Sequence, residues 1–317
     1  LGMKIFGENS FGWRIPQAIL GTLSVYLIYL LAKEIFKDKL LGILSAVVFT
    51  LDGLPLVLSR MGMNDSYVLF FSLLSVYLYL RDKNFWSAFA FGLAIASKWS
   101  GIYTFPIIFI SHFVFHKKLK VSYLSFLIIP IAVYIASYGM MFSTGHTWAN
   151  FVDTQKQMWW YHTNLVAEHP YTSPAWSWPL LLRPIYLYDG QEVNNQVARI
   201  YAFGNPVVFW FGFVSVIVSA IFAFAERNKK LGFVIFSYLI FFLPWIASPR
   251  IMFLYHYLPS IPFLAIASGF VLRRFPKASV YILVSSALLF VYFYPHWIGT
   301  RIPVWLDNSY YWFSTWR

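Results

Sequence analysis

The feature that most constrains this chain is a series of ten apolar segments, separated by short connections except for one long connection at 143–203. A helix that crosses a bilayer needs about 20 predominantly apolar residues. Such segments, some of them short, lie at 13–33, 40–58, 66–80, 84–98, 100–115, 121–142, 204–225, 231–248, 251–272 and 277–295. Only 11% of the residues are charged, against about 25% in soluble domains. The sequence therefore predicts an all-α, polytopic membrane protein with about ten transmembrane helices.

The basic residues are concentrated in every second connection. Fourteen of the 24 lysines and arginines follow the first, third, fifth, seventh and ninth segments. Positive connections of this kind stay on the cytoplasmic side. The net charge of +12 is thus mostly a signal of topology, and we expect no nucleic-acid partner. The chain divides into an N-terminal membrane module at 1–142, an outer loop at 143–203, and a four-helix membrane module with an outer tail at 204–317.

A second group of charged residues lies at the segment ends that this topology places outside. These residues are Arg14, Arg60, Lys98 and Arg250, with Asp65 as a nearby carboxylate. Ionisable groups near membrane depth are costly, and they face a cavity or pair with one another. Any one of them alone is equally consistent with a snorkelling side chain. Together they indicate a site for a membrane-borne anion, and a lipid phosphate is the natural candidate because arginine and lysine both bind phosphate.

The outer loop contains an aromatic stretch from Gln157 to Tyr188, with four tryptophans and four tyrosines. Aromatic rings with polar edges suit the membrane–water interface. We therefore expect this stretch to lie on the bilayer surface and to receive a substrate. His162 and His169 are seven residues apart, but the prolines that follow them disfavour one long helix. The sequence thus favours hydrogen bonding by these histidines over a metal site.

Several segments, in order along the chain, resemble the protein O-mannosyltransferases, a family of C-type (GT-C) glycosyltransferases. In the N-terminal half they are IFGENSFGWRIPQAILGTLSVYLIYLLAK around Arg14, LDGLPLVLSRMGMNDSYVLFF with Asp52, Arg60 and Asp65, and ASKWSGIY around Lys98. In the rest of the chain they are the outer-loop pattern YH…HPYTSPAWSWPLLLRP, GNPVVFW with Asn205, and RIMFLYHYLPSIPFL with Arg250 and His256. The segments cover nearly the whole chain.

The resemblance implies a GT-C fold and a reaction at the outer face of the cell membrane. Mannose passes from a polyprenyl (dolichyl) phosphate mannose donor to Ser/Thr hydroxyls of exported proteins, with inversion. The implied donor phosphate-binding residues are Arg14, Arg60, Lys98, Arg250 and His256. The implied acceptor residues of the outer loop are His162, His169, Trp176, Trp178 and Arg183. The resemblance implies no metal and no cofactor besides the donor, and it implies a homodimer or a heterodimer.

The chain departs from the family pattern at its start. Family members carry one further helix and an outer Asp-Glu pair, whose aspartate is taken as the catalytic base, before the region where this sequence begins. We therefore expect an N-terminally truncated sequence that lacks the first helix and is inactive alone. Asp65 is only a weak candidate for a substitute base.

Three other interpretations stay open. The first is another GT-C enzyme that uses a lipid-phosphate sugar with a lipid or glycan acceptor. The second is a transporter or channel, which is disfavoured because the sequence shows no repeated halves and its polar residues gather at one face. The third is a non-catalytic partner subunit.

Overall fold

The computed structural model describes residues 2–115 and 124–317. Over its described part, each predicted apolar segment is occupied by one helix or by two successive helices. The single helices are α2 (Ser10–Phe36), α5 (Asp65–Leu80), α6 (Asn84–Ser97), α11 (Pro206–Ala225) and α14 (Pro276–Ile298). The pairs are α3 (Lys39–Thr50) with α4 (Gly53–Leu58), η1 (Trp99–Tyr103) with α7 (Thr104–Phe115), α8 (Ser125–Ser137) with α9 (Gly139–Ser143), α12 (Lys229–Phe242) with η4 (Leu243–Trp245), and η5 (Leu254–Ser260) with α13 (Ile261–Arg274).

Four helical stretches are long and apolar enough to cross a bilayer by themselves within the described residues. They are α2, α11, the combined stretch Leu254–Arg274, and α14. Other segments are divided by a cap, as at Asp52, whose carboxylate accepts the N–H of Leu54 at 3.4 Å and starts α4. The prediction of a helical, multi-pass membrane protein is confirmed, and the count of ten spans stays a prediction.

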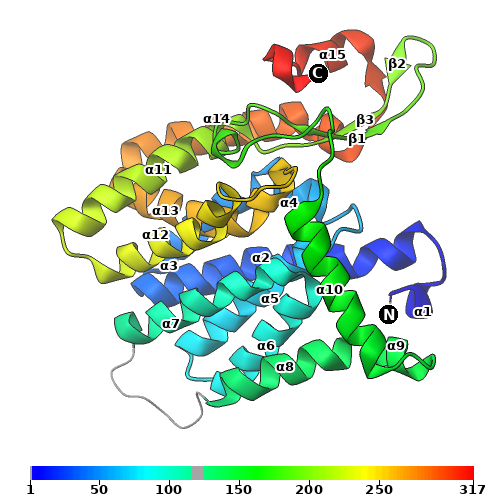
Figure 1. Cartoon of the computed structure of the whole chain (residues 1–317). Helices are drawn as coiled ribbons and strands as arrows, with labels where there is room; N and C mark the ends of the chain where they lie inside the picture. Colours follow the sequence, from blue (N-terminus) through cyan, green and yellow to red (C-terminus); the bar gives the residue numbers. More distant parts are fainter. Residues whose placement is uncertain (1, 116–123) are drawn as a thin grey trace.

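Helix α13 lies at the centre of the core and is almost entirely buried. It packs against α3, α11 and α12, and Figure 1 shows the C-terminal helices (yellow to orange) above the N-terminal ones (blue to cyan). A Cβ atom at Gly269 would lie 2.2 Å from the Ser45 hydroxyl oxygen. Only glycine therefore allows α13 and α3 to approach this closely, as small residues do between membrane helices.

The basic connections of the described chain meet at one end of the molecule. Three ion pairs join them across elements: Arg81 with Glu34 at 3.3 Å, Arg273 with Asp38 at 2.9 Å, and Arg274 with Glu226 at 3.9 Å. This end lies on the left in Figure 1. The predicted alternation of connections is therefore present in the fold, because the basic turns after α2, α5, α11 and α13 share one side.

The opposite end carries a cap that contains short strands as well as helices. β1 (Ile185–Asp189) pairs with β3 (Arg199–Ala202), and β2 (Gln196–Val197) pairs with β4 (Ile302–Pro303), both antiparallel. The short helices of the cap are η3 (Ala175–Ser177), α15 (Val304–Ser309) and η6 (Ser314–Trp316), and α1 (Gly2–Phe6) lies at the same end (Figure 1). The strands correct the all-α expectation locally, and they join the outer loop to the outer tail.

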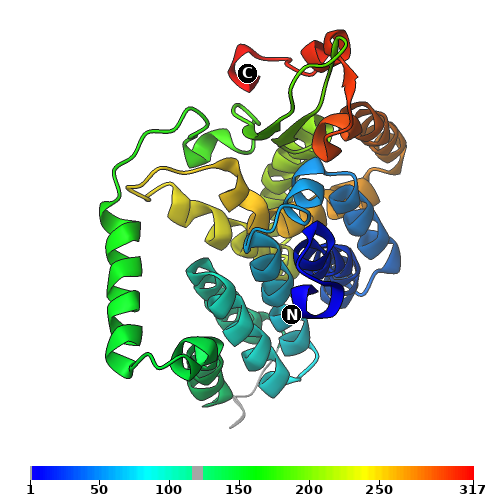
Figure 2. The same cartoon turned by 90° about the vertical axis from the view of Figure 1, so that its right-hand side faces the viewer.

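Helix α10 (Trp148–Asn164) runs along one flank of the helical body, as Figure 2 shows in green. It begins at a capping box between Thr147 and Asn150. It ends before Pro170, so His162 belongs to the helix and His169 does not. The expectation that the prolines prevent one long helix through both histidines is confirmed, but the sequence did not predict a 17-residue helix before them.

Candidate active site

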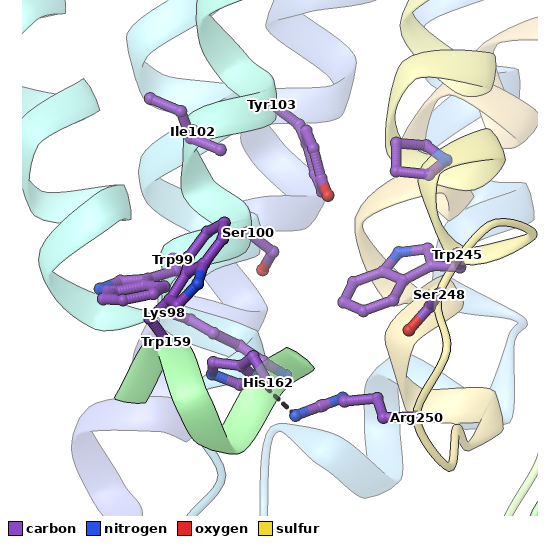
Figure 3. A pocket seen from close by; sticks show the side chains of 11 residues that line it. Lys98, Trp99, Ser100, Ile102, Tyr103, Trp159, His162, Trp245, Ser248 and Arg250 are labelled. Carbon is purple, nitrogen blue, oxygen red and sulfur yellow. Dashed lines mark hydrogen bonds between the residues drawn. The ribbon is translucent and has the colours of Figure 1, made fainter. Parts of the chain in front are cut away.

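A cavity of about 340 Å³ opens at the capped end of the molecule. Its walls come from η1, from the last turns of α10, and from the segment between η4 and Arg250 (Figure 3). Lys98 and Arg250 line it together with His162, and tryptophan and tyrosine rings form much of the remaining wall. The fold thus brings two of the sequence-predicted cations and one predicted loop histidine to a single cavity.

Lys98 is held at the end of α6 by a carboxylate from α5. Its Nζ atom lies 2.8 Å from Asp65 Oδ1, and the two side chains are 23% and 5% exposed. Asp65 is the first residue of α5, where the helix dipole favours a negative charge. The Nζ atom also lies 5.3 Å from the centre of the Tyr255 ring, within cation–π range. Lys98 is therefore fixed in place while part of it faces the cavity.

Arg250 is held by two histidines from different parts of the chain. Its Nη1 donates to His162 Nδ1, and its Nη2 donates to His256 Nε2 at 3.0 Å. The other ring nitrogen of His256 lies 3.0 Å from the carbonyl oxygen of Phe253 and donates to it. This arrangement requires a neutral His256 with its proton on Nδ1, because a guanidinium has only donors. Two neutral acceptors hold Arg250 without cancelling its charge.

The environment of His162 keeps its ring neutral. Burial lowers the pKa of His162, and the positive charges of Arg250 and Lys98 lower it further. A neutral ring leaves a lone pair on Nδ1 for Arg250. The ring also packs against Trp99, with 5.8 Å between ring centres. His162 thus closes the cavity at its α10 side, as Figure 3 shows.

Arg14 and Arg60 do not line this cavity. Arg14 is exposed on α2 and its guanidinium lies 4.5 Å from the ring centre of Trp13. Trp13 packs closely against Gly62, so these two arginines belong to the neighbouring junction of α2 with the turn after α4. The predicted cationic group is therefore divided in space, although its members share one end of the molecule.

The predicted acceptor residues of the outer loop also lie in different environments, some exposed and some buried or bonded to the backbone. Trp176 is 60% exposed and His169 is exposed, whereas Trp178 is 1% exposed and lies beneath the site, parallel to His256 with 6.1 Å between ring centres. Arg183 donates to the carbonyl oxygens of Pro170, Thr315 and Arg317. Trp178 and Arg183 thus make contacts within the fold, and the acceptor role of His162, His169 and Trp176 stays a prediction.

Several wall residues were not singled out from the sequence. They are Trp99, Tyr103, Trp159 and Trp245. Trp99 Nε1 donates to the Tyr134 hydroxyl at 2.7 Å, and that hydroxyl donates to Gln155 Oε1 at 2.5 Å, which ties η1 to α8 and α10. The sequence does place these aromatic residues at or near the ends of apolar segments. Aromatic residues are common at such positions in membrane proteins, so their presence alone does not indicate a site.

The cavity suits an anion that carries apolar and sugar-like parts. Lys98 and Arg250 supply positive charge, while the rings supply flat apolar surface. No group of three or more His, Asp or Glu side chains among residues 2–115 and 124–317 is arranged as a metal site. The arrangement can bind a phosphate. It can also stabilise the negative charge that a phosphate gains when it departs as a leaving group.

Solved membrane proteins share this multi-pass helical fold. The chain superposes on the Saccharomyces cerevisiae protein O-mannosyltransferase Pmt1–Pmt2 complex bound to the sugar donor, with a TM-score of 0.82, 14% identity, and coverage of 97% of this chain and 81% of that one. ArnT from Cupriavidus metallidurans gives a TM-score of 0.60, 13% identity, and coverage of 89% and 49%. These likenesses confirm the GT-C fold.

The sequence places the chain more narrowly. Residues 2–146 match the family model of dolichyl-phosphate-mannose-protein mannosyltransferase, and residues 147–316 match the C-terminal four-helix region of protein O-mannosyltransferase. The chain belongs to the protein O-mannosyltransferase family, which are glycosyltransferases. Curated relatives named polyprenol-phosphate-mannose–protein mannosyltransferase occur in Corynebacterium glutamicum, at 25% identity over 100% of this chain and 79% of the relative, and in Mycobacterium tuberculosis, at 24%, 100% and 79%.

Proposed function

We propose that this chain transfers mannose from a polyprenyl-phosphate mannose to Ser/Thr hydroxyls of exported proteins, at the outer face of the cell membrane. The observation that carries the proposal is the cavity that Lys98 and Arg250 line together. A donor of this kind has a phosphate between an apolar chain and a sugar. A cationic cavity with aromatic walls at a membrane-helix end matches that composition.

The reaction is an inverting displacement. A carboxylate base takes the proton of the acceptor hydroxyl, and the acceptor oxygen forms a bond to the anomeric carbon while the bond from that carbon to the phosphate oxygen breaks. The phosphate leaves with an additional negative charge, which Lys98 and Arg250 stabilise. No general acid is required, because a phosphate is a good leaving group that accepts charge from fixed donors rather than a proton.

Asp65 is a poor candidate for the base that takes the acceptor proton. Its carboxylate is 5% exposed and is bound to Lys98 at 2.8 Å. A base must reach the acceptor hydroxyl directly or through one water, and Asp65 faces Lys98 instead. We assign Asp65 a positioning role, in which it fixes Lys98 beside the cavity.

The acceptor side of the site is formed by α10 and the segment after it. His162 lines the cavity, while Trp159 adds an exposed indole at its mouth. Such rings can lie against a peptide backbone and leave its hydroxyls free for reaction. Because one structural relative is a complex of two mannosyltransferases, we also propose that this chain acts as a homodimer or heterodimer.

The assay that tests this proposal offers two acceptors to the full-length protein in liposomes. Polyprenyl-phosphate mannose labelled in the sugar is supplied with a Ser/Thr peptide or with a lipid-linked glycan. We expect label on the peptide only, and NMR of the product should show that the anomeric configuration is inverted relative to the donor. Label on the lipid-linked glycan would identify a different GT-C reaction, and retained configuration would exclude single displacement. Transfer only when a second chain is added would identify a partner subunit.

A further inference from the structure

A second cavity, of about 460 Å³, lies within the cap and is separate from the candidate active site. It forms where β1, β3, α15 and the last residues of the chain meet a turn of the outer loop. Four tyrosines line it: Tyr171, Tyr186, Tyr201 and Tyr311. Its volume is in the range of about 300–1,000 Å³ that small-molecule sites occupy.

The tyrosines of this cap cavity present both ring faces and hydroxyl edges. Tyr171 and Tyr186 are stacked, with 5.6 Å between ring centres and 25° between ring planes. Tyr201 meets Tyr186 edge-on at 4.7 Å. Flat apolar faces bordered by hydroxyl groups suit a ligand that itself has an apolar face and a rim of hydroxyls.

The charges around the cap cavity cancel one another. Arg199 is bound by Asp189 at 3.0 Å and by the buried Asp307. The remaining cation, Arg317, donates to Asn308 Oδ1 at 2.7 Å and lies 5.1 Å from the ring centre of Tyr311. Both carboxylates bind Arg199, and together the two carboxylates and the two guanidinium groups carry no net charge. The cavity therefore favours a neutral, hydrogen-bonding ligand over an anion such as the donor phosphate.

The walls of the cap cavity are held in place before any ligand binds. Asp189 and Arg199 are register partners in the β1–β3 ladder. Arg183 donates to the carbonyl oxygens of Pro170 and Arg317, at 2.7 Å and 2.9 Å, and so joins two segments that contribute Tyr171 and Arg317 to the cavity wall. A preformed site loses less conformational freedom when it binds a ligand.

A line of aromatic contacts connects this cavity to the candidate active site. Its steps are Tyr171 to His169 at 5.9 Å, His169 to Phe253 at 5.1 Å, and Phe253 to Tyr255 at 5.4 Å between ring centres. Tyr255 is the ring that faces Lys98. Each member is half-buried or exposed. A polypeptide bound along these rings would place one of its residues at the donor site and a more distant one at the cap cavity.

We propose that the cap cavity is a carbohydrate subsite that holds a hexosyl group already attached to the acceptor polypeptide. This inference rests on the proposed function for the identity of the sugar. Its chemistry is independent of the transfer step: the sugar's apolar face lies on the tyrosine rings, and Asp189, Asn308 and the arginines bond its hydroxyls. The enzyme would then hold a modified segment while a neighbouring hydroxyl reacts.

The test measures sugar binding without donor, on the full-length protein in nanodiscs. Saturation-transfer NMR is recorded with methyl α-mannopyranoside, with a mannosylated Ser peptide and with the same peptide unmodified. We expect both sugar-containing ligands to bind. Asp189→Ala and Asn308→Ala should each weaken that binding about tenfold, the effect of one lost hydrogen bond to a charged or polar group. Glu192→Ala removes a carboxylate from the same hairpin outside the cavity and should have no effect.

Transfer to the unmodified peptide should stay unchanged in Asp189→Ala, and sugar binding should stay unchanged in Arg250→Ala. Absence of sugar binding, or equal binding in wild type and Asp189→Ala, would overturn the subsite. Equal affinity for modified and unmodified peptides would show a peptide surface instead and would also overturn it. Sugar binding in a wild-type protein that transfers no mannose would sustain the subsite while refuting the proposed function.

Discussion

Arg250 is the residue around which the candidate site is organised. It donates two hydrogen bonds to neutral histidines, one on α10 and one on η5, and no carboxylate is bonded to it among the described residues. Its positive charge is therefore available to a ligand. Lys98 differs, because it donates a hydrogen bond to the Asp65 carboxylate. The two cations of the cavity thus have unequal roles: Arg250 carries an uncompensated charge, and Lys98 belongs to an ion pair.

The neutral state of His162 predicts a pH dependence. Because burial and two neighbouring cations lower its pKa, the contact with Arg250 is complete above the ordinary histidine value of about 6.5. It is lost as pH falls through the lowered pKa. We expect kcat/KM for mannose transfer to decline on the acidic side in wild type. In His162→Gln, which keeps an acceptor that does not titrate, that decline should disappear.

His169→Gln is the matched control, since His169 is exposed and does not line the active-site cavity. It should keep the acidic decline of the wild type. An unchanged acidic decline in His162→Gln would show that another group controls the pH profile.

The ion pair between Lys98 and Asp65 predicts coupled effects on stability. Lys98→Met leaves the buried Asp65 without its counter-charge, and breaking a buried pair from one side costs about 3–5 kcal/mol. The double variant Lys98→Met/Asp65→Asn removes both charges and should recover part of the lost Tm. Thermal unfolding in detergent measures this coupling. Equal Tm values for the single and double variants would mean that the pair is not formed.

Among single residues, the sequence predicted side-chain positions correctly where membrane topology alone determines them. Lys98 and Arg250 were predicted to meet because both lie at outer segment ends, and they do line one cavity. The same reasoning could not separate Arg14 from that pair, because segment ends specify a membrane level and not a position around the bundle. Arg183 resembled a ligand contact, but its partners are backbone carbonyl groups from residues distant in sequence.

At the scale of elements, the long apolar helices were predictable and the cap was not. Apolar length is a strong signal for a membrane segment. The hairpin in the cap depends on Asn194 and Asn195, whose φ angles of 52° and 58° form the left-handed turn between β1 and β3. Helix α10 depends on a capping box within a polar and aromatic stretch. Both signals are local and short, so hydropathy does not reveal them.

Two asparagines that cap helices are predicted to differ in how much they contribute to stability. Asn205 caps α11 and also donates to the carbonyl oxygens of Leu51 and Ser286, at 2.9 Å and 2.8 Å. Asn228 caps α12, and its side chain accepts from Leu231 and bonds no other residue in the described part of the chain. Asn228→Ala should cost about 1 kcal/mol, the usual effect of a lost cap. Asn205→Ala should cost more, because each buried carbonyl left without a donor adds about 1–3 kcal/mol.

Chemical or thermal unfolding of the two variants in the same detergent compares these costs. A similar loss of stability in both would show that Asn205 does not join the two membrane modules.

At the scale of the whole molecule, the fold separates a basic end from a capped end that holds both cavities. The sequence contains no cysteine, so single cysteines report sidedness cleanly. Glu192→Cys lies in the cap hairpin and Glu226→Cys lies at the basic end, and both positions are exposed. We expect a membrane-impermeant maleimide to label only Glu192→Cys on intact cells and both variants after lysis. The opposite pattern would reverse the proposed orientation.

The proposed function requires that the cavity lined by Lys98 and Arg250 binds the donor phosphate. The most direct measurement compares mannose transfer from polyprenyl-phosphate mannose to a Ser/Thr peptide by Lys98→Ala, Arg250→Ala and Arg227→Ala, all in the full-length protein. Arg227 lies at the basic end and should behave as wild type. We expect each of the first two variants to lose about 10²–10³ in rate, the effect of removing one donor that stabilises developing charge. Wild-type turnover by both would contradict this requirement.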